Sequence, residues 1–134
     1  GVNETIHKKL FLYGYYVGMS FQIIDDVLDF TATEKVLGKP AGSDLWQGNI
    51  TLPVLYALRE PELGQEIRTI HENMSHDELK PILEKIKGSG AIEKSIEVSN
   101  RYLDKAFAIL KELPDTKNTR YLYDIAEFIG KRKY

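Results

Sequence analysis

The stretch that decides the fold is LFLYGYYVGMSFQII, Leu10–Ile24, an apolar run interrupted only by Ser20 and Gln22. It follows the basic segment His7–Lys9, as the apolar region of a signal peptide follows a basic start. However, the run meets Asp25 and a second aspartate after 15 residues, and no small-residue cleavage site follows it. A membrane-spanning helix needs about 20 apolar residues. We therefore expect a helix that is apolar on nearly every side and lies in the middle of a protein.

The composition of the whole chain fits one helical domain. Its 134 residues can bury a core, and 43% hydrophobic with 28% charged residues is typical of an ordered globular domain. Strand-like alternation is absent, so we expect an all-α helical bundle. The chain starts at Gly1 without a methionine and is helical in pattern within a few residues, which reads as a piece of a longer protein.

Charge and cysteine content exclude several functions. Lys plus Arg is 18 and Asp plus Glu is 20, and the net charge of -2 gives no bulk attraction to nucleic acid or to an anionic membrane. We therefore expect no nucleic-acid partner. The absence of cysteine excludes disulfide scaffolds, cysteine nucleophiles, thiolate zinc sites and iron–sulfur clusters, and it fits a reducing compartment.

Glycine spacing in the central run suggests helix packing. Gly14 and Gly18 lie one turn apart, where they would let a neighbouring helix approach closely, although they could simply weaken the helix. If half of the bundle is absent, apolar side chains of this helix lose their neighbours and form a patch that drives self-association or pairing with the missing half. That patch would comprise Leu12, Tyr15, Tyr16, Met19 and Ile23.

Glycine and proline residues divide the rest of the chain. Thr31–Trp46 holds two glycines and a proline and is predicted to be a loop. Ser75 and Glu78 have the spacing of a helix capping box, and Thr51 is a second candidate N-cap. The helices expected after the loop, with any N-cap included, are Thr51–Arg59, Pro61–Asn73, Ser75–Lys87, Ala91–Leu113 and Thr119–Ile129.

Three aspartates end the apolar helix. Asp25 and Asp29 are one turn apart, Asp26 lies three residues before Asp29, and Gln22 shares their face. Like charges this close repel, and the helix macrodipole disfavours carboxylates near a C-terminus. A cation removes the cost, and oxygen ligands favour Mg²⁺, which commonly bridges to phosphate oxygens. The alternative is an acidic helix end that faces water.

A glycine-rich segment, Gly38–Asp44, follows, and its Lys39 lies ten positions after Asp29. Lys39 stands between a glycine and a proline, and it can fold back over the carboxylates. A lysine is a point charge suited to a phosphate, and Asp44 either completes a polar site or satisfies loop amides. Alone the segment indicates a turn; beside the aspartates it indicates a metal-bridged diphosphate.

Three motifs together resemble the trans-isoprenyl (trans-prenyl) diphosphate synthase family. They are FQIIDDVLD at Phe21–Asp29, GKPAGSDL at Gly38–Leu45 and TLPVL at Thr51–Leu55. The first resembles the family's second aspartate-rich motif, and terpene cyclases, which share D-D-x-x-D, lack the G-K loop. Within the family, the resemblance is strongest to the catalytic component of bacterial medium- and long-chain synthases of the heptaprenyl type. The segments LGKPAGSDLWQGNITLPVLYAL and IGKRKY carry that resemblance.

The resemblance implies the C-terminal part of an isoprenoid-synthase-type helical bundle, spanning residues 1–134 of a single catalytic domain. The family's first aspartate-rich motif, its G-G-K-R segment and its Lys-Thr pair are absent, and all of them precede the point that Gly1 matches. One position departs from the pattern, because Asn49 stands where many relatives carry a second lysine. The fragment alone is therefore expected to be inactive.

The resemblance also implies a reaction and its residues. The whole enzyme would condense an allylic prenyl diphosphate with isopentenyl diphosphate, with Mg²⁺ as cofactor, to make a polyprenyl diphosphate for quinone side chains. The implied metal ligands are Asp25, Asp26 and Asp29. The implied catalytic residues are Lys39, Gln22 and Asp25. The residues implied to bind the diphosphate are Lys39, Gln22, Phe21 and Asp44.

The basic tail has two interpretations. Lys131, Arg132 and Lys133 could stabilise the last helix as cations at its C-terminus, which the residues alone favour, or form the family's flap over isopentenyl diphosphate. The implied partners are the missing N-terminal half and a second subunit, either an identical copy or a regulatory chain. The implied location is the cytoplasm, with loose membrane association through the lipid product.

Two other classes of function remain open. A non-catalytic helical subunit or interaction module would keep the fold without a use for clustered carboxylates. A phosphohydrolase or general Mg²⁺-binding helical protein would bind metal and phosphate without a preference for prenyl groups. A Mg²⁺-dependent response to an allylic diphosphate alone separates the prenyltransferase from both.

Overall fold

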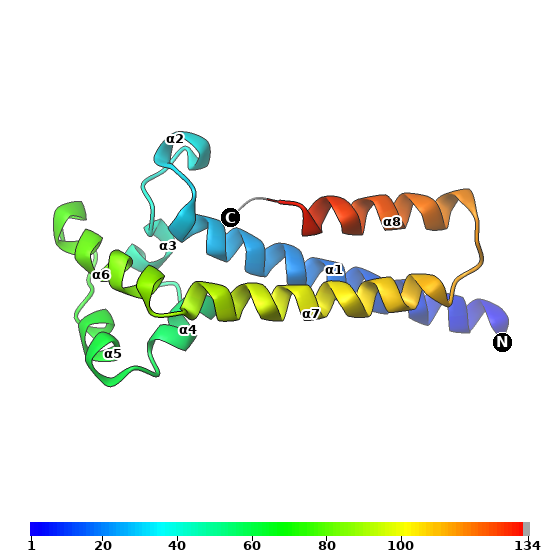
Figure 1. The fold of residues 1–134 in the computed structure, drawn as a ribbon, viewed down its shortest axis with the longest axis horizontal. Coiled ribbons are helices and arrows are strands. Elements are labelled where there is room, and N and C mark those ends of the chain that lie inside the picture. Colours follow the sequence, from blue (N-terminus) through cyan, green and yellow to red (C-terminus); the bar gives the residue numbers. More distant parts are fainter. Residues whose placement is uncertain (133–134) are drawn as a thin grey trace. The chain divides into compact units, whose positions relative to one another are not determined.

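The structure is a computed structural model that describes residues 1–132, except for the side chains of residues 2 and 34. All regular structure in this range is helical, which confirms the predicted all-α class (Figure 1). The helices are α1 (Val2–Thr31), α2 (Glu34–Leu37), α3 (Ser43–Trp46), α4 (Leu52–Ala57), α5 (Pro61–Arg68), α6 (His76–Gly88), α7 (Ala91–Lys111) and α8 (Lys117–Gly130).

The chain divides into two compact units. Unit 1 joins residues 1–24 to residues 97–132, and unit 2 is the continuous segment Asp25–Ile96. The division falls inside α1, between Ile24 and Asp25, so the apolar run lies in unit 1 and the aspartates lie in unit 2.

Unit 1 consists of three helical segments, because α7 returns antiparallel to α1 and α8 turns back again (Figure 1). Two hydrogen bonds tie α1 to its neighbours. The Ser20 and Ser99 hydroxyls lie 2.6 Å apart in the buried interface with α7. The Tyr13 hydroxyl donates to the Leu122 carbonyl oxygen of α8 at 2.6 Å. Apolar side chains fill the space between the helices, among them Val17, Leu103, Ala106, Leu110, Ala126 and Ile129.

The outer surface of α1 differs from the predictions. A Cβ built on Gly14 or Gly18 would meet no atom of the described chain within 4 Å, so the predicted close approach of a helix at these glycines is wrong within residues 1–132. Of the predicted exposed patch, Tyr15 is half exposed, but Ile23 is 4% exposed and belongs to the core. Phe11 is the more exposed apolar side chain, at 70%.

Unit 2 has its own apolar core. Val54, Leu79 and Ile86 are completely covered, and they pack with apolar residues of α1, α5 and α7. The predicted capping box of α6 is confirmed: the Glu78 amide donates to Ser75 Oγ at 3.1 Å, and the Ser75 amide donates to Glu78 Oε1 at 3.3 Å. These bonds satisfy amides that a helix N-terminus leaves unpaired.

Three local predictions need correction. The segment Thr31–Trp46 contains two one-turn helices, α2 and α3, rather than a loop alone. The α5 helix ends at Arg68 rather than Asn73, in a turn where the Thr69 amide and hydroxyl both donate to the Glu66 carbonyl oxygen, at 3.1 and 2.6 Å. Thr51 occupies the N-cap of α4, as predicted, but its side chain makes no capping bond there.

Residues 1–132 contain no helix with the length and apolar character needed to cross a membrane.

Candidate functional site

The aspartates at the end of α1 have different environments. Asp25 and Asp26 are half-buried, whereas Asp29 is 2% exposed. The last turn of α1 carries no basic residue, so nothing within it offsets the negative end of the helix dipole. Because α1 is continuous through this region, all three carboxylates lie within about 6 Å of axial rise.

The loop after α1 places a lysine against the buried aspartate, as the sequence predicted. Lys39 Nζ lies 3.5 Å from Asp29 Oδ1 and 3.3 Å from Asp44 Oδ1. The Asp44 amide donates to Asp29 Oδ2 at 3.3 Å, and the Gly42 amide donates to the Asp29 carbonyl oxygen at 2.9 Å. The loop is therefore bonded to Asp29 through both its backbone and its lysine.

The electrostatics of the aspartate–lysine trio, which consists of Asp29, Lys39 and Asp44, follow from burial and charge. Burial raises the pKa of Asp29, the Asp44 charge raises it further, and Lys39 only partly opposes the shift. For Lys39, burial acts to lower the pKa, but its bonds to Asp44 and the charge of Asp29 outweigh burial and raise it. Lys39 is thus a fixed cation, and its side chain remains 42% exposed to a ligand.

A glycine and a leucine fix the same loop from the other side. Gly42 has a left-handed backbone with φ of 76°, and it precedes the first residue of α3. A Cβ at this position would lie 2.5 Å from Leu83 Cδ2 of α6, and Leu83 is itself buried. The contact presses the loop against α6, so the path of residues 38–44 is determined by α1 and α6 together.

The carboxylates fit a magnesium ion only in part. No three acidic or histidine side chains within residues 1–132 are grouped so that they could hold a metal ion by themselves. Mg²⁺, however, keeps several waters and is usually held by one or two carboxylates together with substrate phosphates. Asp25 and Asp26 are half-buried oxygen donors at a helix end that repels negative charge, which suits such an open site.

The other predicted site residues belong to unit 1. Phe21 and Gln22 are exposed and lie one turn before Asp25 in α1. The Arg132 guanidinium stands over the Phe21 ring, 4.6 Å from its centroid, so the tail contacts one residue predicted to bind diphosphate. Lys131 is exposed, and Lys133 lies outside the described residues.

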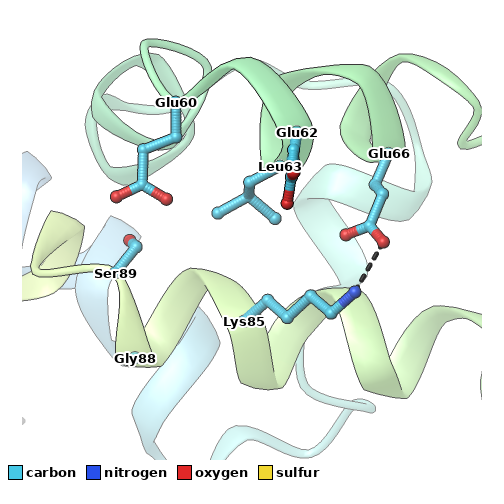
Figure 2. A pocket seen from close by; sticks show the side chains of 7 residues that line it. All are labelled: Glu60, Glu62, Leu63, Glu66, Lys85, Gly88 and Ser89. Atoms are coloured by element: carbon cyan, nitrogen blue, oxygen red, sulfur yellow. Dashed lines mark hydrogen bonds and ion pairs between the residues drawn. The ribbon is translucent and has the colours of Figure 1, made fainter.

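A separate cavity lies in unit 2 between α5 and α6. It measures about 450 Å³, and Figure 2 shows Glu60, Glu62 and Glu66 across from α6. Lys85 makes an ion pair with Glu66 at its edge. None of the residues that line this cavity belongs to the predicted site, so the cavity and the aspartate–lysine trio are different features.

An all-helical fold with clustered aspartates at one helix end, followed by a lysine loop bonded back onto the last of them, has the arrangement of an isoprenoid synthase. The comparison with family models agrees, because the model described as "Polyprenyl synthetase" matches residues 1–86. The chain belongs to the polyprenyl synthetase family.

Individual relatives give the same result. The chain is 54% identical, over all of its length, to "Heptaprenyl diphosphate synthase component 2" of Bacillus subtilis, and it covers 38% of that protein. It is 40% identical to octaprenyl diphosphate synthase of Escherichia coli, with 98% of this chain and 42% of that protein covered. The chain therefore spans about two fifths of the length of these curated relatives.

Solved structures share the fold as well. The crystal structure of heptaprenyl diphosphate synthase from Staphylococcus aureus matches with a TM-score of 0.89 and 43% identity, over 95% of this chain and 40% of that one. A polyprenyl synthase from Caulobacter crescentus, solved in complex with calcium and isoprenyl diphosphate, matches with a TM-score of 0.81 and 32% identity. The match covers 95% of this chain and 40% of that one. These likenesses confirm the isoprenoid-synthase bundle.

Sequence reasoning missed two features of the site. It did not foresee that Asp29 is buried against the loop while Asp25 and Asp26 are half-buried. It also did not link α6 to the site through the contact between Gly42 and Leu83. The apolar residues that flank Asp29, Leu28 and Phe30, were the available signal for burial.

Proposed function

We propose that the protein containing this chain is a polyprenyl diphosphate synthase, which condenses an allylic prenyl diphosphate with isopentenyl diphosphate and depends on Mg²⁺. The observation that carries the proposal is the Lys39 ammonium, held beside Asp29 and Asp44 at the end of the helix that bears Asp25 and Asp26. The Caulobacter relative, whose crystal structure is a complex with calcium and isoprenyl diphosphate, supports a cation and a diphosphate as ligands.

Each residue has a distinct part in this proposal. Asp25 and Asp26 would hold Mg²⁺, which when bound neutralises diphosphate oxygens and so makes the diphosphate a better leaving group. An ammonium has three N–H donors; Asp29 and Asp44 can accept two of them, and the third can reach a diphosphate oxygen. Lys39 thus adds positive charge where negative charge grows as the allylic C–O bond ionises. Phe21 and Gln22 would lie beside the reacting carbons.

We further propose a product of the heptaprenyl type, destined for a quinone side chain. Two relatives that are more than 50% identical are named heptaprenyl diphosphate synthase component 2, and the name implies another component. A second subunit, identical or regulatory, is therefore part of the proposal. So are a cytoplasmic location and a loose association with membranes through the lipid product.

The 134-residue chain corresponds, in this proposal, to the C-terminal part of the synthase domain. Since it covers about two fifths of its relatives, we expect it to lack turnover by itself. Catalysis would require the remaining part of the domain, to which the sequence resemblance assigns the first aspartate-rich motif.

The test is an elongation assay on the whole synthase, with farnesyl diphosphate, radiolabelled isopentenyl diphosphate and Mg²⁺. We expect labelled polyprenyl diphosphate, its loss with EDTA, and a decrease of at least tenfold for Lys39→Met. Lys35→Met is the matched control, because Lys35 is an exposed lysine in the same segment and should leave turnover unchanged. Phosphate release without elongation would indicate a phosphohydrolase, and no response to any diphosphate would indicate a non-catalytic subunit.

A further inference from the structure

The strongest unexplained feature is the orientation of Asp29. Its side chain is 2% exposed, and both of its carboxylate oxygens face the loop that follows α1. Oδ2 accepts the Asp44 amide hydrogen, and Oδ1 lies 3.5 Å from Lys39 Nζ. Its own carbonyl oxygen accepts from the Gly42 amide. Beyond its own helix, Asp29 makes these three contacts with residues 38–44.

A metal ligand needs different surroundings. Mg²⁺ in a phosphate-binding site keeps several waters, so its ligand oxygens must lie where water and ligand can reach them. Asp25 and Asp26 are half-buried and meet that requirement, whereas Asp29 is almost completely covered. The three aspartates of the motif thus fall into two groups.

The loop that Asp29 holds has little freedom to move. The contact of Gly42 with Leu83 fixes the loop against α6, while Asp29 fixes it against α1. Lys39 lies three residues before Gly42, and its ammonium is drawn between two carboxylates. The position of the lysine therefore depends directly on Asp29.

We propose that Asp29 is a positioning residue rather than a metal ligand: its buried carboxylate anchors residues 38–44 and sets the Lys39 ammonium in place to receive a diphosphate. The inference rests on the proposed function, because it takes diphosphate as the ligand of Lys39. It divides the motif into Asp25 and Asp26, which bind the cation, and Asp29, which organises the lysine.

Two binding measurements on the whole synthase test this division. The first counts bound Mn²⁺ by electron paramagnetic resonance in the presence of inorganic pyrophosphate. The second measures the affinity for inorganic pyrophosphate without metal, by calorimetry. We expect Asp29→Asn to change Mn²⁺ affinity by no more than about twofold but to weaken metal-free pyrophosphate binding about tenfold, as loss of an orienting partner does. Asp25→Asn should instead weaken Mn²⁺ binding about tenfold and change the metal-free affinity for pyrophosphate by no more than about twofold.

A double-mutant cycle shows whether Asp29 acts through Lys39. If it does, Asp29→Asn combined with Lys39→Met should bind metal-free pyrophosphate no more weakly than Lys39→Met alone. Asp104→Asn, which neutralises an exposed aspartate of α7, is the control and should leave both affinities unchanged. Additive losses in the cycle would overturn the proposal.

A second variant covers the case in which Asp29→Asn does not fold. Leu83→Ala loosens the loop from the α6 side without touching a charge, and we expect weaker pyrophosphate binding with unchanged Mn²⁺ affinity. The positioning role would be refuted if Asp29→Asn weakened Mn²⁺ binding as strongly as Asp25→Asn does. It would also be refuted if both Leu83→Ala and Asp29→Asn left pyrophosphate binding unchanged. A wild-type synthase that fails to elongate farnesyl diphosphate would instead refute the proposed function.

Discussion

The last turns of α1 and the first turn of α6 both carry clustered acids, but for opposite physical reasons. In α6, Asp77 and Glu78 lie at a helix N-terminus, where the dipole favours negative charge, and Glu78 completes a capping box. In α1, the aspartates lie at a C-terminus with no nearby basic residue in the helix, where the dipole opposes them. Acids that stabilise a helix need no ligand, whereas acids placed against the dipole call for a cation or a lysine.

The largest expected effect comes from the loop that follows the α1 acids. Gly42→Ala would force an alanine into a left-handed conformation and press its Cβ against buried Leu83, which should lower the free energy of unfolding by about 3 kcal/mol. Gly38→Ala is the matched control: its φ is 72°, but its Cβ would meet nothing within 4 Å among the described residues, so about 1–2 kcal/mol is expected. Urea denaturation measures both, and equal losses would contradict the packing argument.

The α6 side of the comparison depends on its cap. Ser75→Ala removes the acceptor for the Glu78 amide and should cost about 1 kcal/mol in urea denaturation. Thr51→Ala removes a residue from the same N-cap position of α4, where the hydroxyl makes no capping bond, so no more than a few tenths of a kcal/mol is expected. If Thr51→Ala lost as much stability as Ser75→Ala, the capping hydrogen bond of Ser75 would not be the cause of the loss.

The effect of burial on a titrating group without a neighbouring acid can be tested at Tyr13, in the unit 1 part of α1. Burial raises the pKa of Tyr13, whose hydroxyl donates to Leu122. Because the folded pKa exceeds the unfolded value of 10.0, the stabilisation is fully present below that pH and is lost as the pH rises through the folded pKa. Tyr13→Phe should cost about 1 kcal/mol at neutral pH and show a weaker alkaline decline. Parallel pH–stability curves for the two proteins would disprove this.

Neutralising one acid at each helix end gives the smallest but most direct comparison. Asp77→Asn should lower the free energy of unfolding by about 0.3–1 kcal/mol, because it removes a favourable dipole interaction. For Asp29→Asn without Mg²⁺, the expected effect is a change of stability relative to wild type that depends on pH. The raised pKa of Asp29 means that its stabilisation is present below its unfolded pKa and lost as the pH rises through its folded pKa.

The stability of Asp29→Asn relative to wild type should therefore rise as the pH increases from the unfolded value of 3.8 through the raised folded pKa of Asp29. Thermal unfolding across this range, with wild type and Asp77→Asn measured alongside, checks the sign. If the difference in stability between Asp29→Asn and wild type stayed constant with pH, the protonation of Asp29 would not be coupled to folding.

The sequence predicted the long helices and the return of Lys39 to the end of α1, because both depend on local signals. Ser75 and Glu78 indicated the start of α6, and the glycine-rich segment after Asp29 indicated a lysine that folds back. The burial of Asp29 against the loop was not predicted, since helical spacing alone cannot tell a carboxylate that faces a ligand from one that faces a loop.

Other features depend on contacts between distant parts of the chain. The contact of Gly42 with Leu83 joins residues that no local pattern connects. The early end of α5 coincides with a turn in which the amide and the hydroxyl of Thr69 both donate to the Glu66 carbonyl oxygen. These features depend on tertiary contacts and on side-chain hydrogen bonds, which the periodicity of apolar residues does not predict.

The hydroxyl pair of Ser20 and Ser99 has a consequence for the order of folding. It joins residues 79 positions apart, and all of unit 2 lies between them in the sequence. Closing so long a loop through an unfolded chain carries a large entropic cost, which falls once the intervening segment is compact. We expect unit 2 to fold first, so that Leu79→Ala slows refolding whereas Ser99→Ala mainly speeds unfolding. The loop that carries Lys39 would then be organised before the long helices of unit 1 come together.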